Sequence, residues 1–461
     1  MSRHYRRGQL GANDKKIVRR SSRERVEESL REITHFFPRD RWLSTANVYG
    51  RNAVRRIYND VKKRHRPPID RDLRHYVAAS TITHCADAWA FYGRAVDCVA
   101  HGDVNSARHL AYYAELRATL SLLATEGIGV FDQYHFVVSE DGSCQQLAPR
   151  GTHNEAWLLL SYWMKLPRSG ALLGKIIAPG GVSIAELLGQ FGNEAITVDL
   201  VLNRWLGEWG LDLYRMHRDR AARNYVSYRP TALTPSLAEQ DIARDMGAVE
   251  NLWRLGEPRE SPFEALDRGL LLLGTLEVFR ALHAPALPQT RPEAYRKRIS
   301  YMLEHVLLPS GIWADSIEAY LFDSATTGTI PRLLQEASGS LGIGEPGQHI
   351  QVLGRALLLL RLATGSCSLL ARGAEIARED LRFWWEPLGR GRGLWAGEFD
   401  QDFEDLWSDV EDELGELQMW GEAGPCSTSS LRRLDSSAAG MEPAGSIVGS
   451  CERLMLWGLA L

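Results

Sequence analysis

Residues 221–230 combine two arginines, one amide and three hydroxyl groups in one short run, Ala-Ala-Arg-Asn-Tyr-Val-Ser-Tyr-Arg-Pro. The preceding residues 215–220 add three more arginines and a histidine. A guanidinium group stays charged at physiological pH and forks onto phosphate oxygens, so this composition is suited to holding a phosphate. Residues 221–230 contain no histidine, so their composition does not decide whether the protein cuts the nucleic acid that it would bind.

Metal-independent RNA cleavage needs a base for the 2′-hydroxyl, an acid for the departing oxygen and a cation beside the phosphorane. Arg223 is suited to supply the cation, and Asn224 to orient the phosphate. Tyr228 is a poor base, because a phenol with a pKa of about 10 is roughly 0.1% ionised at neutral pH. We therefore expect Tyr228 to share proton transfer with His217, nearly two helical turns before Arg223, or with a second subunit.

Charge is distributed unevenly along the chain, although the net charge is only −4. Residues 1–66 contain 19 Lys and Arg against 7 Asp and Glu, whereas residues 398–422 contain 11 Asp and Glu and no Lys or Arg. Three uses of the basic arm are open: contact with nucleic-acid phosphates, a solvated or partly disordered tail, and docking on the acidic end of the same chain. Direct contacts to nucleic acid are expected from the following arginines: Arg19, Arg20, Arg218, Arg220 and Arg229.

Residues 107–118 together with Arg223-Asn224 and Tyr228 resemble the HEPN superfamily, which consists of helical bundles of bacterial toxins and antiphage systems. The nuclease motif of that family is an Arg and a His separated by four to six residues, the first of them usually polar. Arg223 and Asn224 match this pattern, and Tyr228 stands in the position of the His. The resemblance covers roughly residues 70–235. It implies a helical domain that acts on RNA and pairs two motifs across a dimer interface.

Other interpretations of these motifs compete with catalysis. The Arg223 cluster is also suited to brace a helix end before Pro230, or to bind phosphate without cleaving. A second pair, Arg298 and His305, has the family spacing, but the apolar Ile299 follows the arginine. Its surroundings have the pattern of an ordinary amphipathic helix, so we interpret the second pair as a chance match.

The composition narrows the class of protein. A chain of 461 residues exceeds what one hydrophobic core usually supports, which predicts two or three domains. The apolar runs are too short to cross a bilayer and the N-terminus lacks a secretory pattern, so we expect a cytoplasmic protein without membrane contact. Six cysteines without a CxxC pair predict reduced thiols, and neither a metal site nor another cofactor is expected.

The expected fold is mainly α, with many helices in two helical lobes and a basic N-terminal arm. The predicted boundaries are a basic arm at 1–66, a HEPN-like helical domain at 67–235 and a C-terminal helical domain at 236–461. Local signals predict capping boxes at Ser21-x-x-Glu24 and Ser183-x-x-Glu186, a helical hairpin ending at Gly127, and a short strand pair or excursion within 131–151. Helices are predicted at 264–284, 292–307, 349–364 and 367–385, and an acidic amphipathic helix at 400–416.

Together these features favour a component of a bacterial antiphage or conflict system that binds or cleaves RNA. If it cleaves, it would be a metal-independent endoribonuclease. RNA is expected as the partner in preference to DNA, and the protein is expected to be a homodimer or a subunit of a larger defence complex. The alternative is a non-catalytic helical adaptor or scaffold, which the missing histidine favours. A DNA-binding regulator is a third possibility, but the sequence shows no helix-turn-helix pattern.

Overall fold

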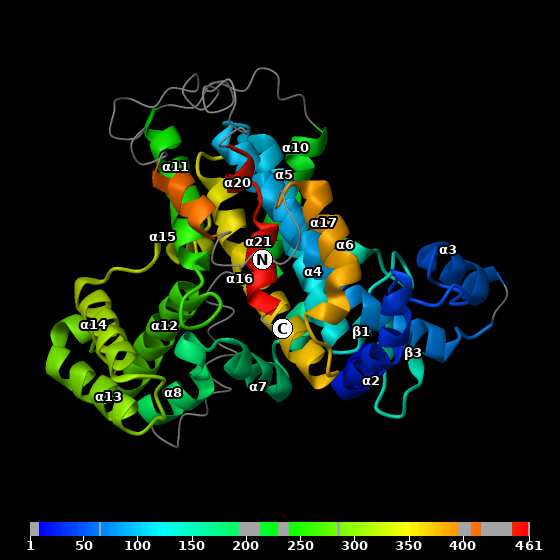
Figure 1. Cartoon of the computed structure of the whole chain (residues 1–461), viewed down its shortest axis with the longest axis horizontal. Coiled ribbons are helices and arrows are strands. Elements are labelled where there is room, and N and C mark those ends of the chain that lie inside the picture. Colours follow the sequence, from blue (N-terminus) through cyan, green and yellow to red (C-terminus); the bar gives the residue numbers. More distant parts are fainter. Residues whose placement is uncertain are drawn as a thin grey trace.

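The computed structural model describes residues 9–63, 66–192, 213–228, 239–283, 286–394, 407–415 and 445–459. Across these residues the protein is mainly helical, with one small three-stranded sheet, so the predicted fold class is confirmed. Figure 1 shows a central group of long helices, with shorter helices on one side and the N-terminal segment on the other.

Three long helices form the centre of the fold: α4 (Asp70–Ala100), α5 (Val104–Thr125) and α16 (Gln348–Gly373). α4 and α5 make the predicted helical hairpin. The side chain of Asp103 caps α5 by accepting a hydrogen bond from the backbone N–H of Ser106 (3.0 Å). After α5, Gly127 has a φ of +80°, a left-handed conformation that glycine adopts without steric cost and that turns the chain away from the helix.

α16 is a single helix, whereas the sequence predicted two helices with a break near Gly365. The glycine does not end the helix, because it serves packing: a Cβ at Gly365 would collide with the side chains of Ile176 and Arg361. α16 is long and apolar enough to cross a membrane, but 94% of its most apolar stretch is buried inside the protein. A helix that is buried on nearly all sides is typical of a protein core, and α16 packs against α4 and α5 in that role.

The basic N-terminal segment is folded from residue 9 onward. It consists of α1 (Ala12–Arg19), α2 (Arg23–Ile33), η2 (Thr34–Arg39), α3 (Ala53–Ile57) and η3 (Tyr58–Lys63). Its apolar side chains, including Val18, Leu30 and Ile57, are buried, and α2 packs against α4. The predicted cap at Ser21 is wrong by one residue, because the hydroxyl of Ser22 accepts the hydrogen bond from the N–H of Arg25 (3.3 Å).

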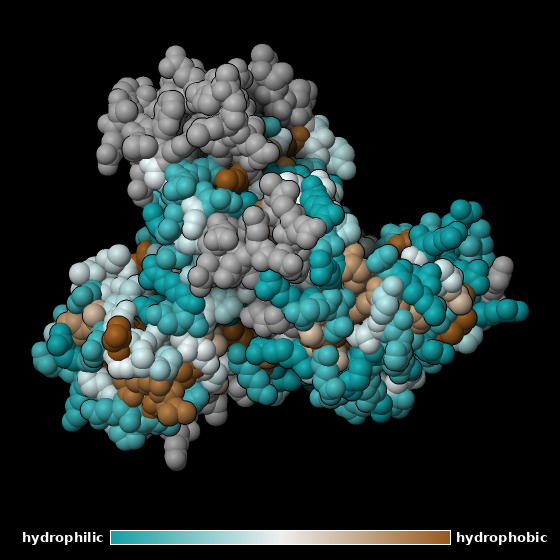
Figure 2. Space-filling model, in the orientation of Figure 1, coloured by the Kyte–Doolittle hydropathy of each residue, from teal (hydrophilic) through white to brown (hydrophobic). Residues whose placement is uncertain are grey.

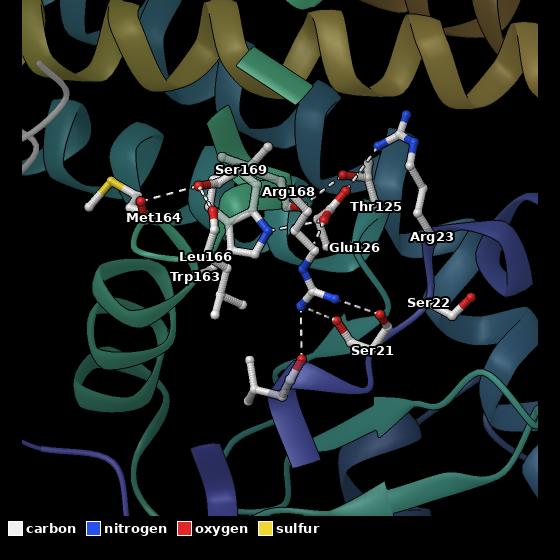
Figure 3. Close-up of polar contacts among 12 residues, drawn as sticks. Ser21, Ser22, Arg23, Thr125, Glu126, Trp163, Met164, Leu166, Arg168 and Ser169 are labelled. Carbon is white, nitrogen blue, oxygen red and sulfur yellow. Dashed lines mark hydrogen bonds and ion pairs between the residues drawn. The ribbon is translucent and has the colours of Figure 1, made fainter. Parts of the chain in front are cut away.

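Glu126, at the end of α5, joins this segment to the central helices (Figure 3). The buried carboxylate accepts hydrogen bonds from the Arg23 guanidinium (3.3 Å) and the Trp163 indole N–H (3.0 Å). Arg168 lies 3.7 Å from the same carboxylate and donates hydrogen bonds to the backbone carbonyl of Ser21 (2.7 Å) and to its hydroxyl (2.7 Å). The N-terminal segment therefore docks on an acidic group of the central bundle.

A small antiparallel sheet covers one end of the α4–α5 hairpin. Its strands are β1 (Ile128–Gly129), β2 (Phe136–Val138) and β3 (Cys144–Gln146), in the order β1-β2-β3. In the register, Val137 lies opposite Ile128 on one side and Gln145 on the other. The predicted strand pair is therefore confirmed, and β1 adds a third strand that the sequence pattern did not predict.

The other described elements pack on the central helices or extend to the flanks of the molecule. They are α6 (Thr152–Trp163), α7 (Pro167–Ile176), η4 (Pro179–Gly181), α8 (Ile184–Phe191), α10 (Leu213–Tyr228), α11 (Glu239–Gly256), α12 (Glu264–His283), η5 (Pro288–Thr290), α13 (Pro292–Glu304), α14 (Gly311–Thr327), α15 (Arg332–Ala337), η6 (Glu379–Leu381), α17 (Arg382–Arg392), α20 (Gly445–Val448) and α21 (Glu452–Leu459). The predicted cap of α8 is confirmed, since the hydroxyl of Ser183 accepts from the N–H of Glu186 (3.2 Å). α12, α13, α14 and α8 gather at the lower left of Figure 1.

The predicted domain boundary near residue 235 lies outside the described residues. On either side of it the core is continuous, because α16 of the second half packs against α4 and α5 of the first. Part of the predicted acidic helix is described: residues 407–415 are helical, with Val410 and Leu414 buried on its apolar side. The remaining residues of that prediction, 400–406 and 416, lie outside the described part.

Candidate nucleic-acid site

α10 carries the arginine-rich run and is held against the central helices by a buried ion pair. The guanidinium of Arg355, on α16, donates two hydrogen bonds to the Asp219 carboxylate (2.7 and 2.6 Å). Glu115, on α5, lies 3.7 Å from the same guanidinium and is also buried. Two parallel hydrogen bonds fix the relative orientation of the two side chains as well as their separation. The ion pair therefore determines which side of α10 faces α5.

Arg223 lies on that side, in contact with a tyrosine of α5. Its guanidinium donates hydrogen bonds to the Tyr113 hydroxyl and to the Asn224 side-chain oxygen (2.9 Å). The guanidinium carbon is 5.2 Å from the centre of the Tyr113 ring, within the range of a cation–π contact. The side chains of Arg223 and Asn224, which the sequence predicts to bind and orient a phosphate, are therefore in direct contact.

Two histidines from other helices flank Arg223. Nδ1 of His109, on α5, is 3.0 Å from the Ser227 hydroxyl, and that hydroxyl donates to the Arg223 carbonyl oxygen (2.9 Å). Nδ1 of His153, in the first turn of α6, is 2.8 Å from the Tyr112 hydroxyl. Within the described part of the chain, neither histidine makes a hydrogen bond through Nε2, and His153 lines the groove described below.

The electrostatic surroundings favour the neutral form of both imidazoles. Burial lowers the pKa of His109, and the positive charge of Arg223 lowers it further. Burial also lowers the pKa of His153, with additional contributions from Arg220 and Arg223. A neutral imidazole is the form that accepts a proton, so each histidine is prepared to act as a base at neutral pH.

The residues that the sequence assigned to proton transfer lie elsewhere on α10. Tyr228 is the last residue of the helix and is 79% exposed. His217 precedes Arg223 by six positions. Six positions rotate an α-helix by one full turn plus about 240°, so the two side chains leave α10 in different directions. Burial and the charge of Arg220 lower the pKa of His217. The charge of Arg223 acts on the pKa of His109 and His153, whereas the charge that acts on the pKa of His217 is that of Arg220.

A groove of about 510 Å³ opens beside this cluster. Its wall is formed by α4, α5, the loop after β1, the first turn of α6, α10 and one residue of α3; the lining includes Val54, Tyr76, His84, Tyr113, Arg117, Phe131, Asp132, His153, Asn154 and Arg220. The lining combines aromatic rings with the guanidinium groups of Arg117 and Arg220, and surfaces that bind single-stranded nucleic acid use the same two kinds of group. Tyr113 belongs both to the groove and to the Arg223 cluster, so the two are continuous.

Several groups in the groove are held in place by their neighbours. Arg220 donates a hydrogen bond to the side-chain oxygen of Asn154. Nδ1 of His84 is 3.1 Å from the Arg117 guanidinium, and burial lowers the pKa of His84 to about 3, with Arg117 adding to the shift. The backbone of Asp132, another residue of the lining, has a left-handed φ of +43°. This conformation is uncommon for residues with a Cβ, and such residues cluster at functional sites.

The other arginines expected to contact nucleic acid have mixed surroundings. Arg218 donates to the carbonyl oxygens of Ser340 and Leu341, so it ties α10 to the loop after α15. Arg19 donates to the Tyr162 hydroxyl (2.8 Å), and Arg20 lies 4.0 Å from Asp141; both arginines are exposed at the end of α1. Arg229 lies outside the described residues. Of the predicted set, the structure places Arg220 in the groove.

The second Arg–His pair is not assembled into a site. The guanidinium of Arg298 faces Nε2 of His283 (3.3 Å) and the Phe191 carbonyl oxygen (2.9 Å). His305 stacks on Tyr301 instead, with ring centres 4.0 Å apart. Within the described residues, no group of three His, Cys, Asp or Glu side chains is arranged to hold a metal ion.

The sequence patterns did not predict His109, His153 or the aromatic residues of the groove as parts of the site. His109 stands within the hairpin segment that carries the family resemblance, four residues before Tyr113. That spacing puts both side chains on one face of a helix, a signal that was available. His153 and Tyr76 come from helices far away in the chain, and no local pattern connects them to Arg223. Comparisons with protein-family models, curated proteins and solved structures found no match to this chain.

Proposed function

We propose that the protein binds RNA at Arg223 and the adjoining groove and cleaves it without a metal ion, as a component of a bacterial antiphage or conflict system in the cytoplasm. One observation carries the proposal: two histidines whose pKa values are lowered, His109 and His153, flank the Arg223 guanidinium beside a groove lined by aromatic and cationic side chains. The resemblance to the HEPN superfamily supports the same reaction, with the histidines supplied by other helices in place of Tyr228.

The chemistry follows from these groups. One imidazole takes the proton of the 2′-hydroxyl, whose oxygen attacks the adjacent phosphorus and forms a 2′,3′-cyclic phosphate. Arg223 stabilises the extra negative charge of the phosphorane, and Asn224, which accepts a hydrogen bond from it, keeps the guanidinium oriented. The arginines lower the pKa of the second imidazole, and the negative charge of the bound phosphate raises it again. The second imidazole can therefore take up a proton and deliver it to the departing 5′-oxygen.

The test is cleavage of labelled RNA in the presence of EDTA. We expect wild type to cut, Arg223→Ala to lose activity by at least about a hundredfold, and His109→Gln and His153→Gln each to lose about a hundredfold or more. Arg280→Ala is the matched control, because Arg280 is an exposed arginine on α12, away from α10. Cleavage that survives Arg223→Ala, or that needs a divalent metal, would refute the proposal.

A non-catalytic adaptor is the second candidate function, and exposed apolar side chains favour it. Leu307 and Ile312, in and after the connection between α13 and α14, are 90% and 85% exposed. Figure 2 shows an apolar patch at the lower left, where α8, α13 and α14 gather, on an otherwise mainly hydrophilic face. An adaptor would leave RNA intact, would lose a co-purifying partner protein on Leu307→Asp, and would keep that partner on Arg223→Ala.

A further inference from the structure

The N-terminal segment supplies one edge of the groove. Val54, on α3, lines the groove, and Tyr58 follows one helical turn later. Tyr58 is 38% exposed, and its ring packs edge-on against Tyr134 with ring centres 6.0 Å apart. Tyr134 belongs to the same loop as Phe131, which forms part of the groove wall. The Tyr58 ring therefore lies on a surface that continues the groove beyond Val54.

Two lysines accompany this ring. The ammonium groups of Lys62 and Lys63 lie 5.9 and 5.4 Å from the centre of the Tyr58 ring, and both side chains are exposed. No carboxylate of the described residues forms an ion pair with either lysine. The three residues occupy η3, a single π-helical turn, a conformation that is rare in proteins and common at functional positions.

We propose that Tyr58, Lys62 and Lys63 form a distal subsite for the same RNA strand that Arg220 and Arg223 hold. The inference rests on the proposed function, and it identifies the substrate as single-stranded RNA of several nucleotides. An unpaired base stacks on the Tyr58 ring, and the two ammonium groups neutralise the neighbouring phosphates. A duplex offers no such base, because its bases are already stacked on each other.

The test is fluorescence anisotropy with labelled 2′-O-methyl oligouridylates, which lack the attacking 2′-hydroxyl and so bind without being cut. Oligomers of about 12 and about four nucleotides are compared, since only the longer strand is expected to reach both subsites. The variants are Tyr58→Ala, Tyr58→Phe, and Lys62→Gln combined with Lys63→Gln. The matched control combines Lys165→Gln with Lys175→Gln, two exposed lysines near α7.

We expect the double lysine variant to bind the longer strand about fivefold more weakly, with a salt dependence reduced by about 1.4 in slope, corresponding to two lost contacts. Its affinity for the short strand and the affinities of the control should change less than about twofold. Tyr58→Ala should weaken binding of the longer strand by about fivefold or more, and Tyr58→Phe should retain it, because phenylalanine preserves the stacking face. Circular dichroism of each variant establishes that it is folded.

Two results would overturn the inference in distinguishable ways. If Arg223→Ala weakens binding of the longer strand but the Tyr58 and lysine variants do not, the distal subsite is refuted and the proposed function stands. If wild type binds neither oligomer, or binds equally well with Arg223→Ala, the proposed function fails and the subsite fails with it. Equal affinity for a duplex of the same length would refute the single-stranded substrate.

Discussion

Arg355 of α16 and Asp219 of α10 form a two-pronged ion pair inside the protein core, with N–O distances of 2.7 and 2.6 Å. This pair connects a core helix to the helix that carries Arg223. Asp219 stands four residues before Arg223, so the pair is one helical turn from the guanidinium that faces Tyr113. Docking of α10 and assembly of the candidate site therefore depend on the same buried contact.

Asp219→Ala is expected to lower the free energy of unfolding by about 3–5 kcal/mol, because it removes the carboxylate that accepts two hydrogen bonds from the buried Arg355 guanidinium. Chemical denaturation measures the effect. Glu28→Ala is the control, since the Arg25–Glu28 pair is exposed and its loss should cost less than about 1 kcal/mol. Equal losses in both variants would contradict a special role for the Arg355–Asp219 pair.

Glu115→Gln is expected to stabilise the protein more at about pH 8 than at about pH 5. Burial raises the pKa of Glu115 well above its usual value, and the Asp219 carboxylate adds to the shift. As the pH rises above the usual value of about 4.5, the unfolded chain releases this proton while the folded protein keeps it, so stability falls. A glutamine stays neutral in both states and removes that loss. Glu28→Gln, at an exposed site, serves as the comparison in unfolding experiments at the two pH values.

The pH dependence of RNA cleavage should identify the base. Because the pKa values of His109 and His153 are both lowered, cleavage should persist below about pH 6.5, where an ordinary histidine is largely protonated. Arg220 lowers the pKa of His153, whereas the charge that lowers that of His109 is Arg223. Arg220→Gln should therefore move the acid limb of the rate profile to higher pH if His153 is the base. An unmoved limb would assign the base to His109.

Glu126→Ala should loosen the N-terminal segment. The change leaves the indole N–H of the buried Trp163 without its acceptor and removes a partner of Arg23, at an expected cost of about 1–3 kcal/mol. Limited proteolysis should then cut α1 and α2 faster. Glu126→Gln keeps an acceptor oxygen and is expected to restore most of the protection. Protection that is unchanged in the alanine variant would show that the segment is held by its apolar contacts alone.

Gly365→Ala is expected to destabilise the protein by about 1–3 kcal/mol, because the new methyl group would overlap Ile176 and Arg361 inside the core. Gly391, in α17, is the matched helical control, since a Cβ there meets open space. Gly391→Ala should be neutral or stabilising by up to about 1 kcal/mol, as alanine favours the helix. Thermal or chemical denaturation of the two variants decides between packing and helix propensity at Gly365.

Local chemistry explains which elements were predictable. The cap of α5 by Asp103, the cap of α8 by Ser183 and the turn between β2 and β3 depend on side chains within a few residues of each other, so the sequence alone specifies them. The break expected near Gly365 failed because a glycine signals a helix end and a close packing contact in the same way. Only the position of Ile176, on another helix, distinguishes the two.

The sequence by itself determined the helical class of the protein and the local grouping of Arg223 with Asn224, since adjacent residues share a neighbourhood in any fold. It could not supply the histidines. His109, His153 and the groove residue Tyr76 come from three different helices, and their approach to α10 depends on how α4, α5, α6 and α16 pack. Hydrophobic burial drives that packing, but it is non-directional, so a local run of sequence does not specify which helices meet. The tertiary structure therefore decided which side chains share the candidate site with Arg223.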